Sequence, residues 1–179
     1  MQHELFRHIE IEVFVTRSRL ADAIAYVVWL LRHLAGETLD PPNSVRQRLQ
    51  SSEHWRVVES LQGRYLHHYP ICIRKVLPDD TLISMSAGSD EPSYALSFIS
   101  YARPSRREGF FHFAQVLATT MATLFDARPH WGKVCPLPPS ELVRLYPGLR
   151  EFAAIHKRID PAGTFGNEWV RAILAAAVS

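Results

Sequence analysis

Apolar and polar residues alternate at the start of the chain. The β-branched residues of the stretch 8–15 all fall at odd positions: Ile9, Ile11, Val13 and Val15. The even positions carry Glu10, Glu12 and Phe14. Successive strand side chains point to opposite faces, so this repeat of two predicts a half-buried strand.

The spacing then changes to that of a helix. Apolar residues recur every three or four positions: Leu20, Ala23, Ile24, Val27, Val28, Leu31 and Leu34. Thr16 or Ser18 stands where an N-cap belongs, and Gly36 follows as a stop. The stretch 37–65 has a weaker pattern, with a loop at 40–44 and one or two short helices over 45–61. We interpret His54 and Trp55 there as parts of a surface helix with one docked aromatic ring.

Further strands and helices are predicted downstream. Alternation at 69–76, 82–85 and 94–101 predicts three strands, with a loop at 88–92. Apolar residues at helical spacing run from Phe110 to Leu124, and Arg128-Pro129 ends that helix. Beyond a Pro-rich turn we expect short helices at 140–145 and 148–159 and a last helix from Glu168.

The order β-α-β-β-α predicts an α+β fold. We expect an antiparallel sheet with the two long helices on one face, of ferredoxin-like character, plus a helical C-terminal tail. At 179 residues the chain fits a single domain over 1–179, with an apparent insertion at about 37–65.

Composition and charge exclude several classes of protein. A formal net charge of +2, with basic residues interleaved with acids, indicates neither nucleic-acid binding nor a polybasic membrane patch. The opening MQHELFRHIEIEVFV is not a signal peptide, and no apolar run is long enough to span a bilayer. We therefore expect a cytoplasmic protein without a transmembrane segment.

The residues by themselves show few signs of a catalytic or ligand-binding site. The sequence has no Gly-rich phosphate loop, no Gly-x-Ser-x-Gly motif and no convincing metal-ligand spacing. His67 and His68 precede Cys72, but neighbouring strand residues face opposite ways, so we expect no metal site. Arg74 lies in a strand rich in Ile and is either a pocket residue or an edge-strand arginine. Lys133 is either a cleft-lining ammonium or an exposed turn residue.

The tail carries a longer and more specific pattern. Arg128-Pro129-His130-Trp131-Gly132-Lys133 is followed by Leu145-Tyr146-Pro147, by Phe152 and by Asp160-Pro161-x-Gly163-x-Phe165-x-Asn167. This order resembles the C-terminal end of the sugar-lactone oxidases. That group includes the D-arabinono-1,4-lactone and L-gulonolactone oxidases, with the alditol oxidases close by, in the vanillyl-alcohol-oxidase flavoprotein superfamily. The stretch 70–80 also fits the family's substrate-side strand, and the lactone-oxidase-like tail spans 128–179.

The resemblance implies a cofactor and roles for several residues. In such enzymes an N-terminal domain holds FAD, and a C-terminal cap domain closes over the isoalloxazine ring. By that resemblance Lys133 would stabilise negative charge on the reduced ring, and Arg74 would face the substrate. The wall and the cofactor interface would be formed by His130, Trp131 and Asn167. FAD would bind only together with a flavin-binding domain.

Departures from the family pattern fall on the expected substrate pocket. Its predicted residues are Cys72, Ile99, Tyr101 and Cys135. Where the family has a glutamate two residues before its arginine, this chain has Cys72. Ile99 and Cys135 stand where the family often has histidines, so polar groups that would handle substrate hydroxyls are missing. We interpret the cysteines as small hydrophobic residues, with a reactive thiol, or a disulfide between them, as the alternative.

Three functions compete at this point. In the first hypothesis, the chain is the substrate-side component of an FAD-dependent oxidoreductase that acts on CH–OH groups of a sugar lactone or polyol. This hypothesis expects that no flavin-binding domain precedes Met1, that such a domain or subunit is a partner, and that the chain alone is inactive. Alternatively it is a stand-alone cap domain, as a possible homodimer, that acts as a non-redox enzyme or binds a more apolar small molecule. The third hypothesis is an inactive remnant.

Overall fold

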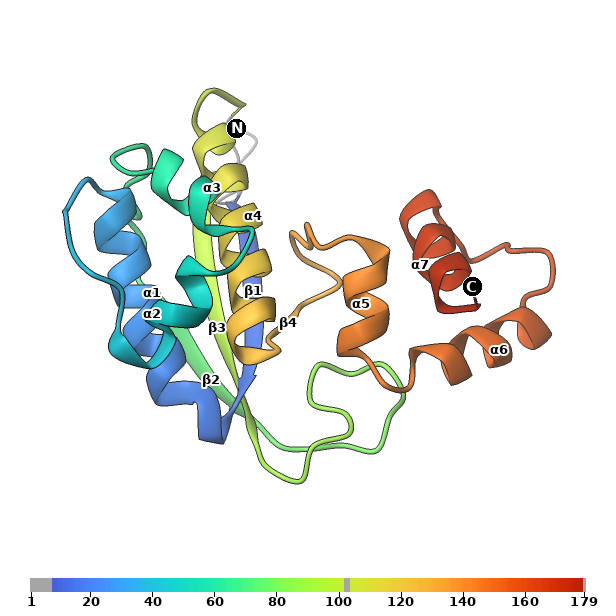
Figure 1. The fold of residues 1–179 in the computed structure, drawn as a ribbon. Helices are drawn as coiled ribbons and strands as arrows, with labels where there is room; N and C mark the ends of the chain where they lie inside the picture. Colours follow the sequence, from blue (N-terminus) through green and yellow to red (C-terminus); the bar gives the residue numbers. More distant parts are fainter. Residues whose placement is uncertain (1–7, 102–103, 179) are drawn as a thin grey trace, which may run out of the picture.

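The alternating stretch at the start of the chain forms the central strand of a sheet. A computed structural model describes residues 8–101 and 104–178 (Figure 1). Strand β1 spans His8–Thr16. Ile11, Val13 and Val15 are at most 1% exposed, so the odd positions point into the core as the repeat of two predicts.

Four strands form one antiparallel sheet in the described part of the chain. Strands β2 (Cys72–Val76), β3 (Ser93–Tyr101) and β4 (Arg128–Pro129) join β1 in the order β2-β3-β1-β4. Helix α1 (Leu20–Leu34) follows β1, and helix α4 (Pro104–Phe125) follows β3. The resulting order βαββαβ is that of a ferredoxin-like fold. The predicted α+β class is confirmed.

The core fills the space between the sheet and the two long helices. Phe98 of β3 and Phe113 of α4 are both at most 1% exposed, and their rings meet edge to face at 5.5 Å. Figure 1 shows α1–α4 on one side of the sheet. The opposite face of the sheet is therefore free of these helices.

Short helices occupy the expected insertion. Helices α2 (Asn43–Gln50) and α3 (Trp55–Ser60) lie within 37–65. Trp55 stacks on Trp29 of α1, with ring centroids 6.3 Å apart. That contact agrees with the interpretation of Trp55 as a docked aromatic ring.

The predicted strand at 82–85 is wrong. These residues belong to a loop between β2 and β3. The Arg128 guanidinium approaches the carbonyl oxygens of Ser84, Met85 and Ala87, at 2.6 Å for Ala87. Carbonyl groups that a neighbouring strand would otherwise satisfy are thus engaged by a side chain.

Two element boundaries also differ from the expectation. A 3-10 turn, η1 (Arg17–Arg19), separates β1 from α1, and neither Thr16 nor Ser18 caps the long helix. The Ser18 hydroxyl instead donates to Glu91 at 2.6 Å. Helix α4 ends before Arg128, and Arg128-Pro129 then pairs with Phe14 and Val13 as strand β4.

The C-terminal tail forms an arm on the other side of the sheet. Helices α5 (Pro139–Leu145), α6 (Leu149–Ile159) and α7 (Glu168–Val178) extend away from it (Figure 1). The Trp131 ring meets those of Tyr146 and Trp169 edge to face, at 4.9 Å and 5.6 Å, which joins the arm to the sheet. Among the described residues, no helix combines the length and the apolar character required to cross a membrane.

Candidate functional site

The helix-free face of the sheet gathers charged side chains on neighbouring strands. Glu12 of β1 lies opposite Ser97 of β3, which lies opposite Cys72 of β2. Arg74 is two residues beyond Cys72 and therefore points to the same face. The even positions of β1 thus lie on the same face of the sheet as the Arg74 cation of β2.

Glu12 is a buried carboxylate, with 2% of its side chain exposed. It accepts a hydrogen bond from the Ser97 hydroxyl at 2.7 Å and forms an ion pair with Arg74. Burial acts to raise the pKa of Glu12, but the hydrogen bonds from Ser97 and Arg74, with the Arg74 charge, outweigh it and lower the pKa. The hydrogen bond and charge of Glu12 raise the pKa of Arg74. Glu12 therefore keeps the Arg74 guanidinium charged and fixes it on this face of the sheet.

A second ion pair stands beside the first. The turn 130–134 is held to β1 by two backbone hydrogen bonds, from His130 to the Glu12 carbonyl at 2.8 Å and from Val134 to the Glu10 carbonyl at 2.9 Å. Lys133, between them, forms an ion pair with Glu10. Glu10 and Glu12 are two residues apart on one strand, which separates them by about 7 Å. Because both acids belong to β1, this strand sets the spacing between their partners, Arg74 and Lys133.

A cleft of about 690 Å³ opens on this face. Most of its surface is apolar, and its apolar walls come from Phe14, Val76, Ile83, Met85, Ala95 and Trp131. Polar groups of Glu12, Arg74 and His130 converge on it. Ser86 is also in the lining set, and its buried hydroxyl has no hydrogen-bond partner among the described residues. Size, apolar walls and a few polar groups are typical of a small-molecule site.

The structure brings most of the predicted site residues to one face, although not all of them line the cleft. Arg74, His130 and Trp131 do. Lys133 is paired with Glu10 outside the lining set, and Ile99 lies opposite Glu10 on β3. Their assignments as site residues stay predictions.

Tyr101 and Asn167 lie away from the cleft lining. Tyr101 is at the end of β3, and its ring stacks on His68 at 4.9 Å. Asn167 is on the arm, where its Oδ1 accepts a hydrogen bond from the Val170 backbone and caps α7. Asn167 is not among the residues that line the cleft in the described part of the chain.

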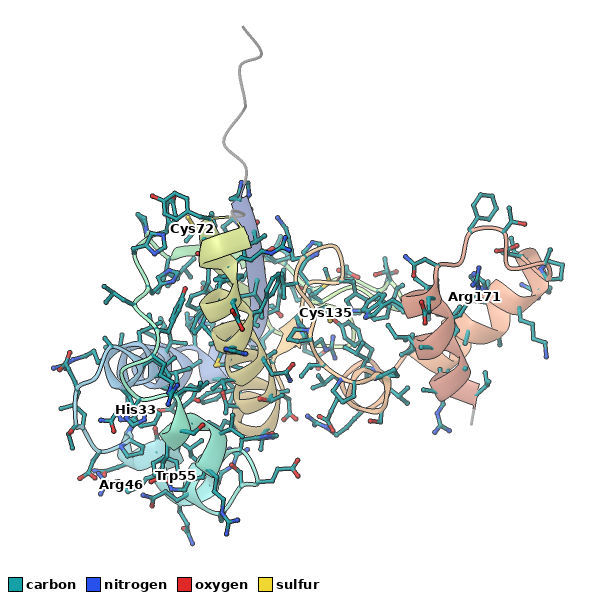
Figure 2. The ribbon with its side chains drawn as sticks, turned by 90° about the horizontal axis from the view of Figure 1, so that it is seen from above. His33, Arg46, Trp55, Cys72, Cys135 and Arg171 are labelled. Carbon is teal, nitrogen blue, oxygen red and sulfur yellow. The ribbon has the colours of Figure 1, made fainter. Side chains whose placement is uncertain are left out.

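Both cysteines are free. Cys72 is exposed, and Cys135 is partly buried, which raises its pKa to about 11 and keeps the thiol protonated at neutral pH. Strands β3 and β1 lie between Cys72 and the segment that carries Cys135. Figure 2 shows the two side chains well apart. The alternative of a disulfide between them is wrong for this fold.

Several residues that line the cleft are not among the predicted site residues. The sequence pattern predicts Glu12 and Phe14 only as the second face of a strand, although an acid inside an apolar strand is itself a signal that a partner is needed. The loop 81–86, of which 82–85 is predicted as a strand, contributes Thr81, Ile83, Ser84, Met85 and Ser86 to the cleft. Its sequence carries no motif that indicates this role.

Replacing Glu12 with glutamine should make stability depend less on pH. Because the pKa of Glu12 is lower in the folded protein, the carboxylate stabilises the fold above its unfolded pKa of about 4.3. That contribution is lost as pH falls through the lower, folded pKa. We expect Glu12→Gln to lower the free energy of unfolding at pH 7 by about 1–2 kcal/mol, and by less at pH 3.

Urea unfolding at both pH values measures this effect. Glu59→Gln, at an exposed position on α3, is the matched control and should change neither value. An equal loss at pH 7 and pH 3 for Glu12→Gln contradicts the assigned role of the carboxylate.

The chain is similar in sequence to one protein family and to several known oxidoreductases. Residues 5–173 match the family model described as D-arabinono-1,4-lactone oxidase. The chain is 48% identical over 98% of its length to a long-chain alcohol oxidase of an uncultured marine euryarchaeote, of which it spans 37%. It is 31% identical over 75% of its length to the L-gulono-1,4-lactone dehydrogenase of Mycobacterium tuberculosis, spanning 29% of that protein. An alditol oxidase of a Streptomyces species matches at 30% identity over 57% of this chain and 23% of its own length.

These matches confirm the resemblance inferred from the stretches 70–80 and 128–167. The relatives are lactone, alditol and alcohol oxidoreductases by name, and each is much longer than the segment shared with this chain. The family model matches nearly the whole sequence. The chain therefore belongs to the D-arabinono-1,4-lactone oxidase family.

Proposed function

We propose that this chain is the substrate-side part of an FAD-dependent alcohol oxidase and completes a flavin site whose other wall lies outside it. The observation that carries the proposal is the pair of cations on one strand face, Arg74 over Glu12 and Lys133 over Glu10. A flavin-binding domain or subunit would supply the rest of the site. Family membership is the second support.

The residues of the cleft fit a flavin ring and a small substrate. The cleft combines apolar walls with the Arg74 cation and the unpaired, buried Ser86 hydroxyl, and aromatic heterocycles carry both apolar faces and polar edges. Arg74, His130 and Trp131 would face this space, with Lys133 at its margin. When bound, FAD supplies an acceptor for the hydride that leaves the alcohol carbon, and the hydroxyl proton would be released to solvent as the carbonyl forms.

The contributions of the chain's own residues follow from their contacts. Arg74, fixed by Glu12, would orient the substrate hydroxyl and stabilise negative charge that develops on its oxygen. Lys133, fixed by Glu10, would add positive charge at the cofactor side. The loop 81–86 and Trp131 would exclude water from the reacting group.

The lining favours an alcohol with an apolar tail over a sugar lactone or polyol. Most of the cleft surface is apolar. Outside the lining set, Cys72, Ile99 and Cys135 stand where the family resemblance implies polar groups. The relative at 48% identity is named as a long-chain alcohol oxidase. A saturated chain gains about 0.8 kcal/mol for each buried CH₂ group, which such walls provide.

Flavin bleaching tests the proposal. The chain is produced together with the flavin-binding part of the oxidase, and 1-decanol, xylitol and an arabinono-lactone are added without oxygen. We expect a yellow complex whose flavin is bleached, at the lowest concentration, by decanol. A complex without flavin, or one that no alcohol bleaches, overturns the proposal.

A second function is favoured by the apolar lining of the cleft. Because most of the cleft surface is apolar, the chain would bind an apolar small molecule without redox chemistry. Decanol binding by the chain alone, measured by calorimetry, together with a complex that never takes up flavin, would support this binding module.

A further inference from the structure

The turn that follows β4 holds the His130 ring in one orientation. The Gly132 backbone N–H donates a hydrogen bond to Nδ1 of His130 at 2.9 Å. A backbone N–H only donates, so Nδ1 must keep its lone pair and the proton of the neutral ring sits on Nε2. The contact thus selects one of the two neutral forms of the imidazole.

Gly132 allows this contact because it has no side chain. A Cβ at this position would lie 3.2 Å from Cε1 and 3.4 Å from Nδ1 of His130. The ring therefore lies directly against the glycine. The His130 backbone is itself hydrogen-bonded to the Glu12 carbonyl at 2.8 Å, so the base of the side chain is fixed as well.

The other ring nitrogen has no protein partner. Across residues 8–101 and 104–178, no protein atom accepts a hydrogen bond from Nε2 of His130. The side chain lines the cleft with Arg74 and Glu12. An N–H donor that is fixed in position and left without an acceptor is suited to an acceptor atom of a ligand.

We propose that His130 is a fixed hydrogen-bond donor to the hydroxyl oxygen of the bound alcohol, held in that role by the Gly132 backbone. The inference rests on the proposed function for the identity of the ligand. In this arrangement Arg74 and His130 both donate to the substrate oxygen, and Glu12 keeps Arg74 in place. His130 is a binding and specificity residue for an oxygen that carries lone pairs.

Nitrogen-15 NMR tests the protonation form without any cofactor. In the full chain labelled at histidine, the spectrum at pH 8 should show the His130 proton on Nε2 and an unprotonated Nδ1. The exposed His112 of α4 serves as a reference, and its ring is expected to exchange between the two neutral forms. A proton on Nδ1 of His130, or exchange like that of His112, overturns the proposal whatever the protein's activity.

Two substitutions test the contact with the substrate. His130→Gln keeps an N–H donor at a similar reach, whereas His130→Leu removes it. In the flavin-loaded complex we expect His130→Leu to raise KM for decanol by about 3–10-fold, the loss of one hydrogen bond, with recovery in His130→Gln. Equal KM values in both variants and the wild type overturn the contact with the substrate.

The two experiments separate the failures. A wild-type complex that oxidises no alcohol, beside a spectrum with the proton on Nε2, means that the proposed function and the contact with an alcohol fail while the fixed protonation form stands. A wrong protonation form with normal turnover means that only the inference about His130 fails.

Discussion

Replacing Arg74 with methionine is expected to lower alcohol turnover by the flavin-loaded protein by about 10²–10³-fold. The guanidinium lines the cleft and is fixed by Glu12, so it is in place before charge develops on the substrate oxygen. Methionine keeps an unbranched stem of similar length but donates no hydrogen bond. The rate of flavin bleaching by decanol, followed in a stopped-flow instrument, measures the loss.

The buried partner of Arg74 requires its own control. Arg74→Met leaves the carboxylate of Glu12 with the Ser97 hydroxyl alone, and an uncompensated buried charge destabilises a fold. In the double variant Arg74→Met/Glu12→Gln that charge is gone, so stability should recover while turnover stays low. Recovery of both would mean that Arg74 acts on the fold and not on the substrate.

A surface arginine serves as the matched control for charge. Arg32 of α1 is paired with Glu37, and both side chains are about half exposed. Arg32→Met removes the same charge far from the cleft and should leave turnover unchanged, because exposed pairs contribute little. Turnover of Arg74→Met within threefold of the wild type contradicts the proposed role.

The sequence predicts the elements of this fold better than it predicts their partners. The odd positions 9–15 indicate β1, and the helical spacing from Leu20 to Leu34 indicates α1. These patterns are local and reflect burial against one core. By contrast, Glu12 and Arg74 are 62 residues apart, and Glu10 and Lys133 are 123 apart. Which acid meets which cation depends on strand register, which no local repeat specifies.

Two differences between the predicted and the observed elements have the same physical cause, which is contact between residues far apart in the sequence. The loop 82–85 alternates like a strand, yet the Arg128 guanidinium approaches its carbonyl groups. Strand β4 has two residues and leaves no periodic signal, although it completes the sheet. Both features depend on Arg128, a residue that the sequence marked only as a helix end. The part of the cleft that the loop lines is therefore not predictable from periodicity.

The same loop is anchored by a glycine of the tail. Gly148, at the start of α6, approaches the Leu82 backbone so closely that a Cβ there would lie 2.3 Å from the Leu82 carbonyl oxygen and 2.8 Å from its Cα. The φ angle of Gly148 is −79°, which any residue adopts. Space alone, and not backbone conformation, excludes a side chain at this position.

Replacing Gly148 with alanine is therefore expected to lower the free energy of unfolding by about 3 kcal/mol. Backbone lies on both sides of the clash, so no flexible side chain can move aside. The loop must separate from the tail, and with it Ile83, Ser84 and Met85 leave the cleft. Weaker decanol binding should accompany the loss of stability, as measured by urea unfolding and by KM.

Gly109 of α4 provides the control for the alanine substitution itself. A Cβ there would lie 3.6 Å from Tyr65, an ordinary contact, and alanine favours a helix over glycine by up to about 1 kcal/mol. Gly109→Ala should leave stability unchanged or raise it. Because the two substitutions add the same methyl group, equal stability of the two variants would show that the tail does not hold the loop, and the wall of the cleft would need another support.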